Sequence, residues 1–141
     1  MPSLDEENLN GLCKEILQLD KSIRFIGMAN NLGSLVATAY RNDLTPLMDK
    51  QETSHYAIQA VLRATTREDF ESKIGKLEYS IGKYERLLRA TIPIPIRPFG
   101  KEYDESKFYY LLVSFDLNSN VIDVIENKII PFIQKNKERK L

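Results

Sequence analysis

The stretch RFIGMANNLGSLVATAY, residues 24–40, predicts a β-hairpin and with it the fold class. Residues 23–28 alternate as a strand does, and residues 34–41 do so again after a short polar break. The break, residues 30–33, has turn chemistry, because asparagine tolerates a positive φ and glycine has no Cβ to oppose one. Both faces are largely apolar, which is typical of a sheet covered on both sides. In the first strand, one face is expected to carry Ile23, Phe25 and Gly27 and the other Arg24, Ile26 and Met28. In the second strand, one face is expected to carry Leu35, Ala37 and Ala39 and the other Val36, Thr38 and Tyr40.

Amphipathic segments before and after the hairpin predict helices. The first begins at Ser3, which is spaced from Glu6 as in a capping box, and ends near residue 20. The second begins at Asp49 with Glu52 as its capping partner. It either continues through Phe70 or is followed by a short helix capped by Thr66 and Asp69, and Gly75 ends either version. The expected apolar stripes are Leu9, Leu12, Cys13, Ile16 and Leu17 in the first helix, Ile58, Val61, Leu62 and Thr65 in the second, and Val121, Ile122, Ile125, Ile129, Phe132 and Ile133 in a third.

Three further strands are expected between the second and third helices. Residues 77–84 alternate with Leu77, Tyr79 and Ile81 inward, which indicates an edge or half-exposed strand. Residues 108–116 are the most β-favouring run and are expected at the centre of the sheet.

Prolines constrain the pairing of one predicted strand and the shape of the third predicted helix. Pro93 and Pro95 would place both missing N–H groups on one side of a strand. Residues 87–92 are therefore expected to pair on both sides, and residues 93–96 to overhang the sheet. Pro131 is expected to bend the third helix, because its ring displaces the hydrogen bond to the carbonyl four residues earlier.

Composition excludes several classes of protein. The 141 residues suit one domain, and 20 basic and 20 acidic side chains cancel, whereas nucleic-acid binding needs a basic field. The acidic start is no signal peptide, and no apolar run approaches the ~20 residues of a membrane helix. One cysteine and one histidine leave no internal disulfide or zinc site. We expect one cytoplasmic domain over residues 1–141, without a cofactor, with a mobile loop at 97–107 and a basic tail at 135–141.

The element order α-β-β-α-β-β-β-α resembles the profilin-like folds, and within them the roadblock/LC7 and longin families. The resemblance is carried by that order and by the turn with Asn30, Asn31 and Gly33. It implies an α/β (α+β) domain with a single five-stranded antiparallel sheet of order 2-1-5-4-3 and helices on both faces. It also implies dimerisation and, for some relatives, regulation of small GTPases. The opening LCKEIL…IRF…G (residues 12–27) is similar to that of a group of small archaeal proteins, a likeness that implies no activity.

No arrangement of residues predicts catalysis. His55 is expected on the surface and Cys13 in the core, and the sequence names a positioned partner for neither. Asp104, Glu105 and Asp116 could form a carboxylate group near the end of the last strand, although solvated loop charges are the expected interpretation.

A run of basic residues surrounds the fourth predicted strand. It predicts either a ridge that receives an acidic partner or a phosphate, or a solvated face beside an edge strand. These residues are Lys83, Arg86, Arg89, Arg97 and Lys101.

The leading interpretation is a non-enzymatic interaction or regulatory module that forms a homodimer. The unpaired edge at 77–84 is a template for a second copy, and the helix at 50–65 could pack beside it. The expected contacts are Leu77, Tyr79, Ile81, Ile58 and Leu62. The alternative is a small-molecule sensor with a cavity between the sheet and one helix layer, lined by Phe25, Met28, Tyr110 and Leu112.

Overall fold

The computed structural model describes residues 4–94 and 109–136, and five strands in this part form one antiparallel sheet. The order is β2-β1-β5-β4-β3, so the predicted fold class and strand order are confirmed. The strands are β1 (Ile23–Asn30), β2 (Leu35–Tyr40), β3 (Ser80–Lys83), β4 (Leu88–Ile94) and β5 (Tyr109–Phe115).

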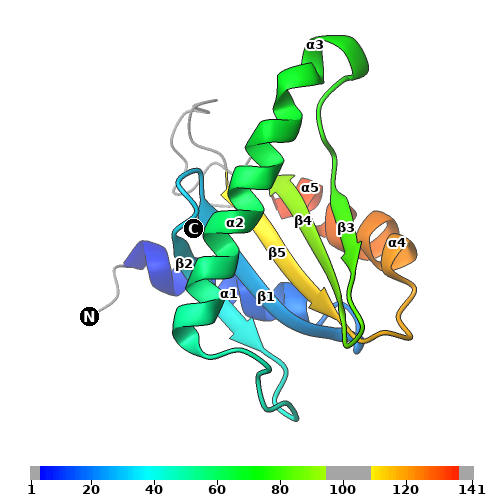
Figure 1. Cartoon of the computed structure of the whole chain (residues 1–141). Helices are drawn as coiled ribbons and strands as arrows, with labels where there is room; N and C mark the ends of the chain where they lie inside the picture. The colour runs from blue at the N-terminus through cyan, green and yellow to red at the C-terminus, as the bar shows by residue number, and fades with distance from the viewer. Residues whose placement is uncertain (1–3, 95–108, 137–141) are drawn as a thin grey trace.

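Helices cover both faces of the sheet (Figure 1). One face carries α1 (Leu4–Leu17) and a C-terminal helix made of α4 (Val121–Val124), the π-helical turn η3 (Ile125–Ile129) and α5 (Ile130–Asn136). The other face carries α2 (Lys50–Arg67) alone. After α2 the short helices η1 (Glu68–Phe70) and α3 (Glu71–Ile74) project beyond the sheet before the chain returns to β3 (Figure 1).

Strand β5 is central and buried on both faces, as predicted. Leu111, Val113 and Phe115 pack against α1 and the C-terminal helix. Tyr110 and Leu112 pack beneath α2. A strand that is buried on both faces has apolar side chains at successive positions, because neighbouring residues point to opposite faces. This explains the nearly continuous apolar run LLVSF.

The hairpin forms as predicted, but two β-bulges change its faces. A register shift between Ile23 and Phe25 places Ile23 in the core under α1, with Ile26 and Met28. A second shift pairs Met28 with Ala37 and Ala29 with Leu35, so Leu35 packs on the α2 side while Ala37 and Ala39 pack on the α1 side. The predicted alternation was wrong at these points, because a bulge adds one residue to one strand and reverses the faces beyond it.

The hairpin turn is held by Asn30 and rests against α2. The side-chain oxygen of Asn30 accepts hydrogen bonds from the N–H groups of Leu32 (2.9 Å) and Ser34 (3.0 Å). Gly33 has a φ of 86°, and a Cβ there would lie 2.8 Å from the Cα of Ile58. The turn therefore needs glycine both for its backbone conformation and for its close approach to the helix.

The capping box of α2 is confirmed, whereas its predicted apolar stripe is right at Val61 and wrong at Ile58 and Leu62. The Glu52 N–H donates to Asp49 Oδ1 at 2.8 Å, and the Asp49 N–H donates to Glu52 Oε1 at 3.1 Å. Ile58 and Leu62 point away from the sheet and are 50% and 64% exposed. The residues that α2 buries are Thr53, Tyr56, Ala57, Ala60, Val61 and Ala64. Alanines let the helix lie close to the sheet, and this favours small side chains over the larger aliphatic ones.

Strand β3 is shorter than predicted, and the expected overhang after residue 92 is wrong. Pro93 and Ile94 remain paired with Tyr110 and Tyr109 of β5. Pro93 lies beyond Thr91, the last residue of β4 that β3 pairs, so its missing N–H costs no bond to β3. Residues 95–96, the loop at 97–107 and the tail from 137 onward lie outside the described residues.

The C-terminal helix buries most of its predicted stripe. Val121, Ile125, Ile129 and Ile133 face the core, while Ile122 is 59% exposed. The π-helical turn η3 immediately precedes α5, which contains Pro131. A wider turn accommodates a proline that cannot donate the ordinary helical hydrogen bond.

Two glycine-to-alanine changes test the turn. Gly33→Ala should lower the free energy of unfolding by about 2–3 kcal/mol, because alanine disfavours the positive φ and its Cβ would clash with α2. Gly11→Ala, at an exposed position of α1 with no atom within 4 Å, should raise it by about 0.5–1 kcal/mol. Urea denaturation measures both, and an unchanged Gly33→Ala variant would contradict the packing of the turn on α2.

Candidate functional site

The outward side of α2 and the segment that follows it carry large apolar side chains without a covering layer in the described part of the chain. Leu62 and Ile58 face outward on α2, and Phe70 and Ile74 are 63% and 84% exposed further along. A soluble helix normally turns such side chains inward and small or polar ones outward. Here small side chains face the sheet, and two large aliphatic side chains lie among the polar ones on the outward face of α2. Exposed apolar side chains of this kind make the outward side of α2 a candidate interaction surface.

Strand β3 is an edge strand, and its predicted contact residues lie at different depths. Ile81 pairs with Ala90 and is 38% exposed. Tyr79 is half-buried against the core under the C-terminal helix, and its hydroxyl donates to Glu126 Oε1 at 2.6 Å. Leu77 is half-buried as well. The edge therefore offers its backbone and Ile81, while Tyr79 is occupied within the protomer.

The residues of the predicted basic ridge do not lie on one surface in the described part of the chain. Lys83 and Arg86 are exposed at and after the end of β3. Arg89 instead turns toward α2, where its guanidinium carbon lies 3.8 Å from the ring centre of Tyr56 and 5.3 Å from that of Tyr84. Arg97 and Lys101 lie outside the described residues.

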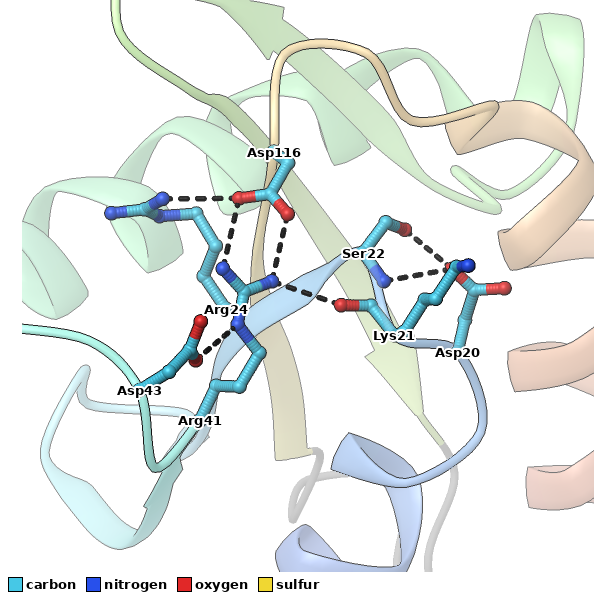
Figure 2. A network of polar contacts seen from close by, with 7 residues as sticks. All are labelled: Asp20, Lys21, Ser22, Arg24, Arg41, Asp43 and Asp116. Carbon is cyan, nitrogen blue, oxygen red and sulfur yellow. Dashed lines mark hydrogen bonds and ion pairs between the residues drawn. The ribbon is translucent and has the colours of Figure 1, made fainter.

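A polar network joins the ends of β1, β2 and β5 (Figure 2). Asp116 accepts from Arg41 through both oxygens, at 2.7 and 3.2 Å, and from Arg24 at 3.0 Å. Arg41 also donates to Asp43 at 2.7 Å and to the carbonyl of Lys21 at 2.9 Å. These bonds, with Arg41 first, hold the pKa of Asp116 below its usual range.

A second carboxylate, Asp20, lies beside this network. It accepts from Lys128 at 2.6 Å and from the hydroxyl and the N–H of Ser22 at 2.5 and 3.0 Å, and these contacts, with Lys128 first, lower its pKa to about 2. Asp116 and Asp20 are thus both held as carboxylates by donors. A general acid needs the opposite environment. Asp104 and Glu105, which the sequence grouped with Asp116, lie outside the described residues.

The four side chains that were expected to line the cavity of a sensor do not lie together on one face of the sheet. Met28 packs under α1, on the other face of the sheet from Phe25. Tyr110 and Leu112 are 2% and 0% exposed in the core beneath α2. Phe25 lines a small hollow of about 50 Å³ between the sheet and α2, together with Met48 and Tyr56. The four residues do not share one cavity, because β1 contributes to both faces.

The candidate reactive residues Cys13 and His55 lie in the core and on the surface, respectively, as expected. Cys13 is fully buried, and burial raises the pKa of its thiol to about 12. His55 is exposed on α2. Within residues 4–94 and 109–136, no three His, Cys, Asp or Glu side chains are grouped to hold a metal ion. No helix in that part of the chain has the length and apolar character that crossing a bilayer requires.

No protein-family model and no curated protein matches this sequence. Solved structures do match. A structure of MglB with a tetrameric arrangement has a TM-score of 0.68 over 99% of this chain and 88% of its own, at 12% identity. The gliding protein MglB of Thermus thermophilus gives 0.67 over 100% and 90%, at 12% identity. A Roadblock/LC7 domain from Streptomyces avermitilis gives 0.63 over 90% and 92%, at 9% identity.

The chain has a roadblock/LC7-like fold. This agrees with the resemblance inferred from the element order, and at these identities the likeness concerns the fold alone. The roadblock-like sheet presents β3 as one edge and α2 as the single helix over one face. These two elements carry the exposed surface described above.

Sequence patterns missed two arginines and a tyrosine near Arg89. Tyr56, Arg63 and Arg67 of α2 line a hollow together with Arg89. The signal was present, because residues two and three helical turns after Tyr56 lie on the same side of a helix. The apolar stripe that was expected on α2 includes Ile58 and Leu62, which lie on a different side of the helix.

Replacing Asp116 tests the network. Asp116→Asn should lower the free energy of unfolding at pH 7 by about 1–2 kcal/mol, because two arginines lose their shared carboxylate. The folded-state pKa of Asp116 is depressed, so its contribution is complete above its unfolded pKa and is lost as the pH falls through the folded value. The difference between the two proteins should therefore shrink below about pH 4.

The matched control is Asp43→Asn. This side chain is 69% exposed and pairs with Arg41 alone among the described residues, so the change should cost less than about 0.5 kcal/mol. Urea denaturation between pH 7 and pH 3 measures both variants. Equal effects, or a difference that persists in acid, would show that Asp116 is not the centre of the network.

Proposed function

We propose that the chain is a non-enzymatic regulatory interaction module, and that it pairs with a second copy through the outward face of α2 and the edge strand β3. The observation that carries this proposal is the exposure of two large aliphatic side chains on the outward face of α2. Its small side chains cover the sheet, and Ile58 and Leu62 are exposed on the opposite side. Burying such side chains against another protein contributes about 1.5–3 kcal/mol each.

The edge strand supports the same mode of association. β3 has β4 as its neighbour on one side and ends the sheet on the other. An edge of this kind pairs readily with an identical strand, and a two-fold axis makes the contact self-complementary. An antiparallel pair of β3 strands would continue the sheet into the second copy and bring the two α2 helices to the same face.

The partner regulated by such a dimer is the second part of the proposal. The resemblance to roadblock relatives implies a small GTPase as the class of partner. One similar structure, that of MglB, has a tetrameric arrangement, which supports assembly through this fold. A dimer would present two α2 helices side by side and so offer a larger surface than one chain does.

A charge introduced on the outward face should prevent self-association. Leu62→Glu should raise the dissociation constant of the dimer by at least ~30-fold, as expected for a residue that contributes about 2 kcal/mol. Ile81→Glu should weaken it through the edge. Sedimentation velocity over a range of concentrations measures both effects.

The control is Ile122→Glu. Ile122 is 59% exposed, comparable with Leu62, but lies on α4 in the other helix layer. This variant should associate like the unaltered protein. If Ile122→Glu dissociates the dimer and Leu62→Glu does not, the interface lies on the other layer and the proposal is wrong.

A further inference from the structure

Three arginines surround one hollow between α2 and the β3–β4 edge. Arg63 and Arg67 come from α2, and Arg89 comes from β4. The hollow has a volume of about 310 Å³, and Tyr56 and Tyr84 also line it. That volume is at the lower end of small-ligand pockets. We use the term arginine hollow for the space lined by these five residues.

The positive charge of the arginine hollow is not neutralised by the part of the chain that the structure describes. None of the three guanidinium groups makes an ion pair there. Arg89 stacks on Tyr56 and donates through Nη2 to the sulfur of Met48 at 3.2 Å, which is a weak acceptor. Its Nε is buried without a hydrogen-bond partner among the described residues. These contacts hold the guanidinium in place while leaving donor capacity unused.

The hydroxyl of Tyr56 is a second, independent sign of a missing ligand. Tyr56 is 6% exposed, and its hydroxyl has no partner within the described residues. A buried hydroxyl without a partner costs about 1–3 kcal/mol. Burial raises the pKa of Tyr56 to about 12, and the charges of Arg89 and Arg63 act on it in the opposite direction. The phenol is therefore a neutral donor at pH 7, placed among the arginines.

The sheet leaves the hollow open on its edge side. Gly82 of β3 pairs with Arg89, and it carries no side chain that would cover the guanidinium. A Cβ at Gly82 would contact the ring of Tyr84 at 3.4 Å and nothing nearer. A larger side chain there would extend into the arginine hollow without straining the backbone of β3.

We propose that the arginine hollow binds the phosphate group of a small molecule. A phosphate group carries close to two negative charges at pH 7 and presents three acceptor oxygens. Guanidinium groups bind such oxygens in pairs, and the phenol of Tyr56 supplies a further donor. A single carboxylate would leave two of the three arginine charges uncompensated, so phosphate is the better match in charge. The two tyrosine rings suit an aromatic or planar remainder of the ligand.

The site is separate from the outward face of α2, although it borders the edge strand, because Ser80, Ile81 and Gly82 of β3 also line the arginine hollow. Arg63 and Arg67 lie on the side of α2 toward β3, whereas Ile58 and Leu62 point away from the sheet. The Leu62→Glu variant should therefore bind a phosphate compound as the unaltered protein does. Failure of self-association and failure of ligand binding can then be told apart.

Isothermal titration of the full chain with phenyl phosphate, inorganic phosphate and benzoate tests the proposal. Phenyl phosphate should bind saturably and at least ~10-fold more tightly than benzoate, which has the same ring and one negative charge. Inorganic phosphate tests whether the free anion suffices, and weaker binding than phenyl phosphate supports a ligand with an organic remainder. Inorganic phosphate binding as tightly as phenyl phosphate would overturn that part of the proposal.

Variants locate the binding site. The Arg63→Gln/Arg67→Gln double variant should weaken phenyl phosphate binding at least ~10-fold, and Tyr56→Phe, which keeps the ring, about 3–10-fold. Gly82→Leu should weaken binding by filling the hollow while leaving every charge in place. The control is Lys83→Gln/Arg86→Gln, which removes two exposed basic residues outside the hollow.

The proposal is overturned if phenyl phosphate does not bind, if benzoate binds equally well, or if the control double variant loses as much affinity as the Arg63→Gln/Arg67→Gln variant. Urea denaturation of each variant establishes that it is folded. Should the arginine double variant not fold, Tyr56→Phe and Gly82→Leu decide the result. Unchanged affinity in both of these would place the phosphate elsewhere.

Discussion

The burial of β5 on both faces is the constraint on which the rest of this structure depends. One helix layer packs against Leu111, Val113 and Phe115, and the helix on the opposite face packs against Tyr110 and Leu112. The first face is wide and receives two helices, while the second is covered by α2 alone. A single helix can seal that face only by lying close to it. The alanines at the sheet side of α2 permit this approach, and the larger aliphatic side chains of the helix are consequently directed outward.

The same arrangement accounts for both surfaces to which we assign a function. The outward side of α2 carries Ile58 and Leu62 because its inward side holds small side chains. Strand β3 is an edge because the segment between β2 and β3 forms helices and adds no strand beside it. The side of α2 toward β3 carries Arg63 and Arg67 above Arg89. One helix therefore carries the two exposed aliphatic side chains of the proposed protein contact and, on a different side, the two arginines of the proposed phosphate site.

Local chemistry allowed much of the fold to be predicted from the sequence. The turn at Asn30, the capping box at Asp49 and the central place of β5 depend on residues close in sequence or on a continuous apolar run. The two β-bulges could not be predicted, because a register shift depends on the partner strand. The buried side of α2 was wrongly predicted at Ile58 and Leu62. Their hydrophobicity predicted burial, whereas the close packing of the helix on the sheet requires small side chains there. Arg89 was identified, but its partners Arg63 and Arg67 were not, since they lie on another element and meet it only in the folded chain.

Hydrogen–deuterium exchange of the full chain at high and low protein concentration tests the central claim most directly. If copies pair through β3 and α2, backbone amides of β3 lose access to solvent in the dimer, and exchange over residues 77–84 slows as the concentration rises. The segment around Ile122, on the other helix layer, should exchange at the same rate throughout. Exchange over residues 77–84 that does not change with concentration while the protein is dimeric would contradict pairing through this edge.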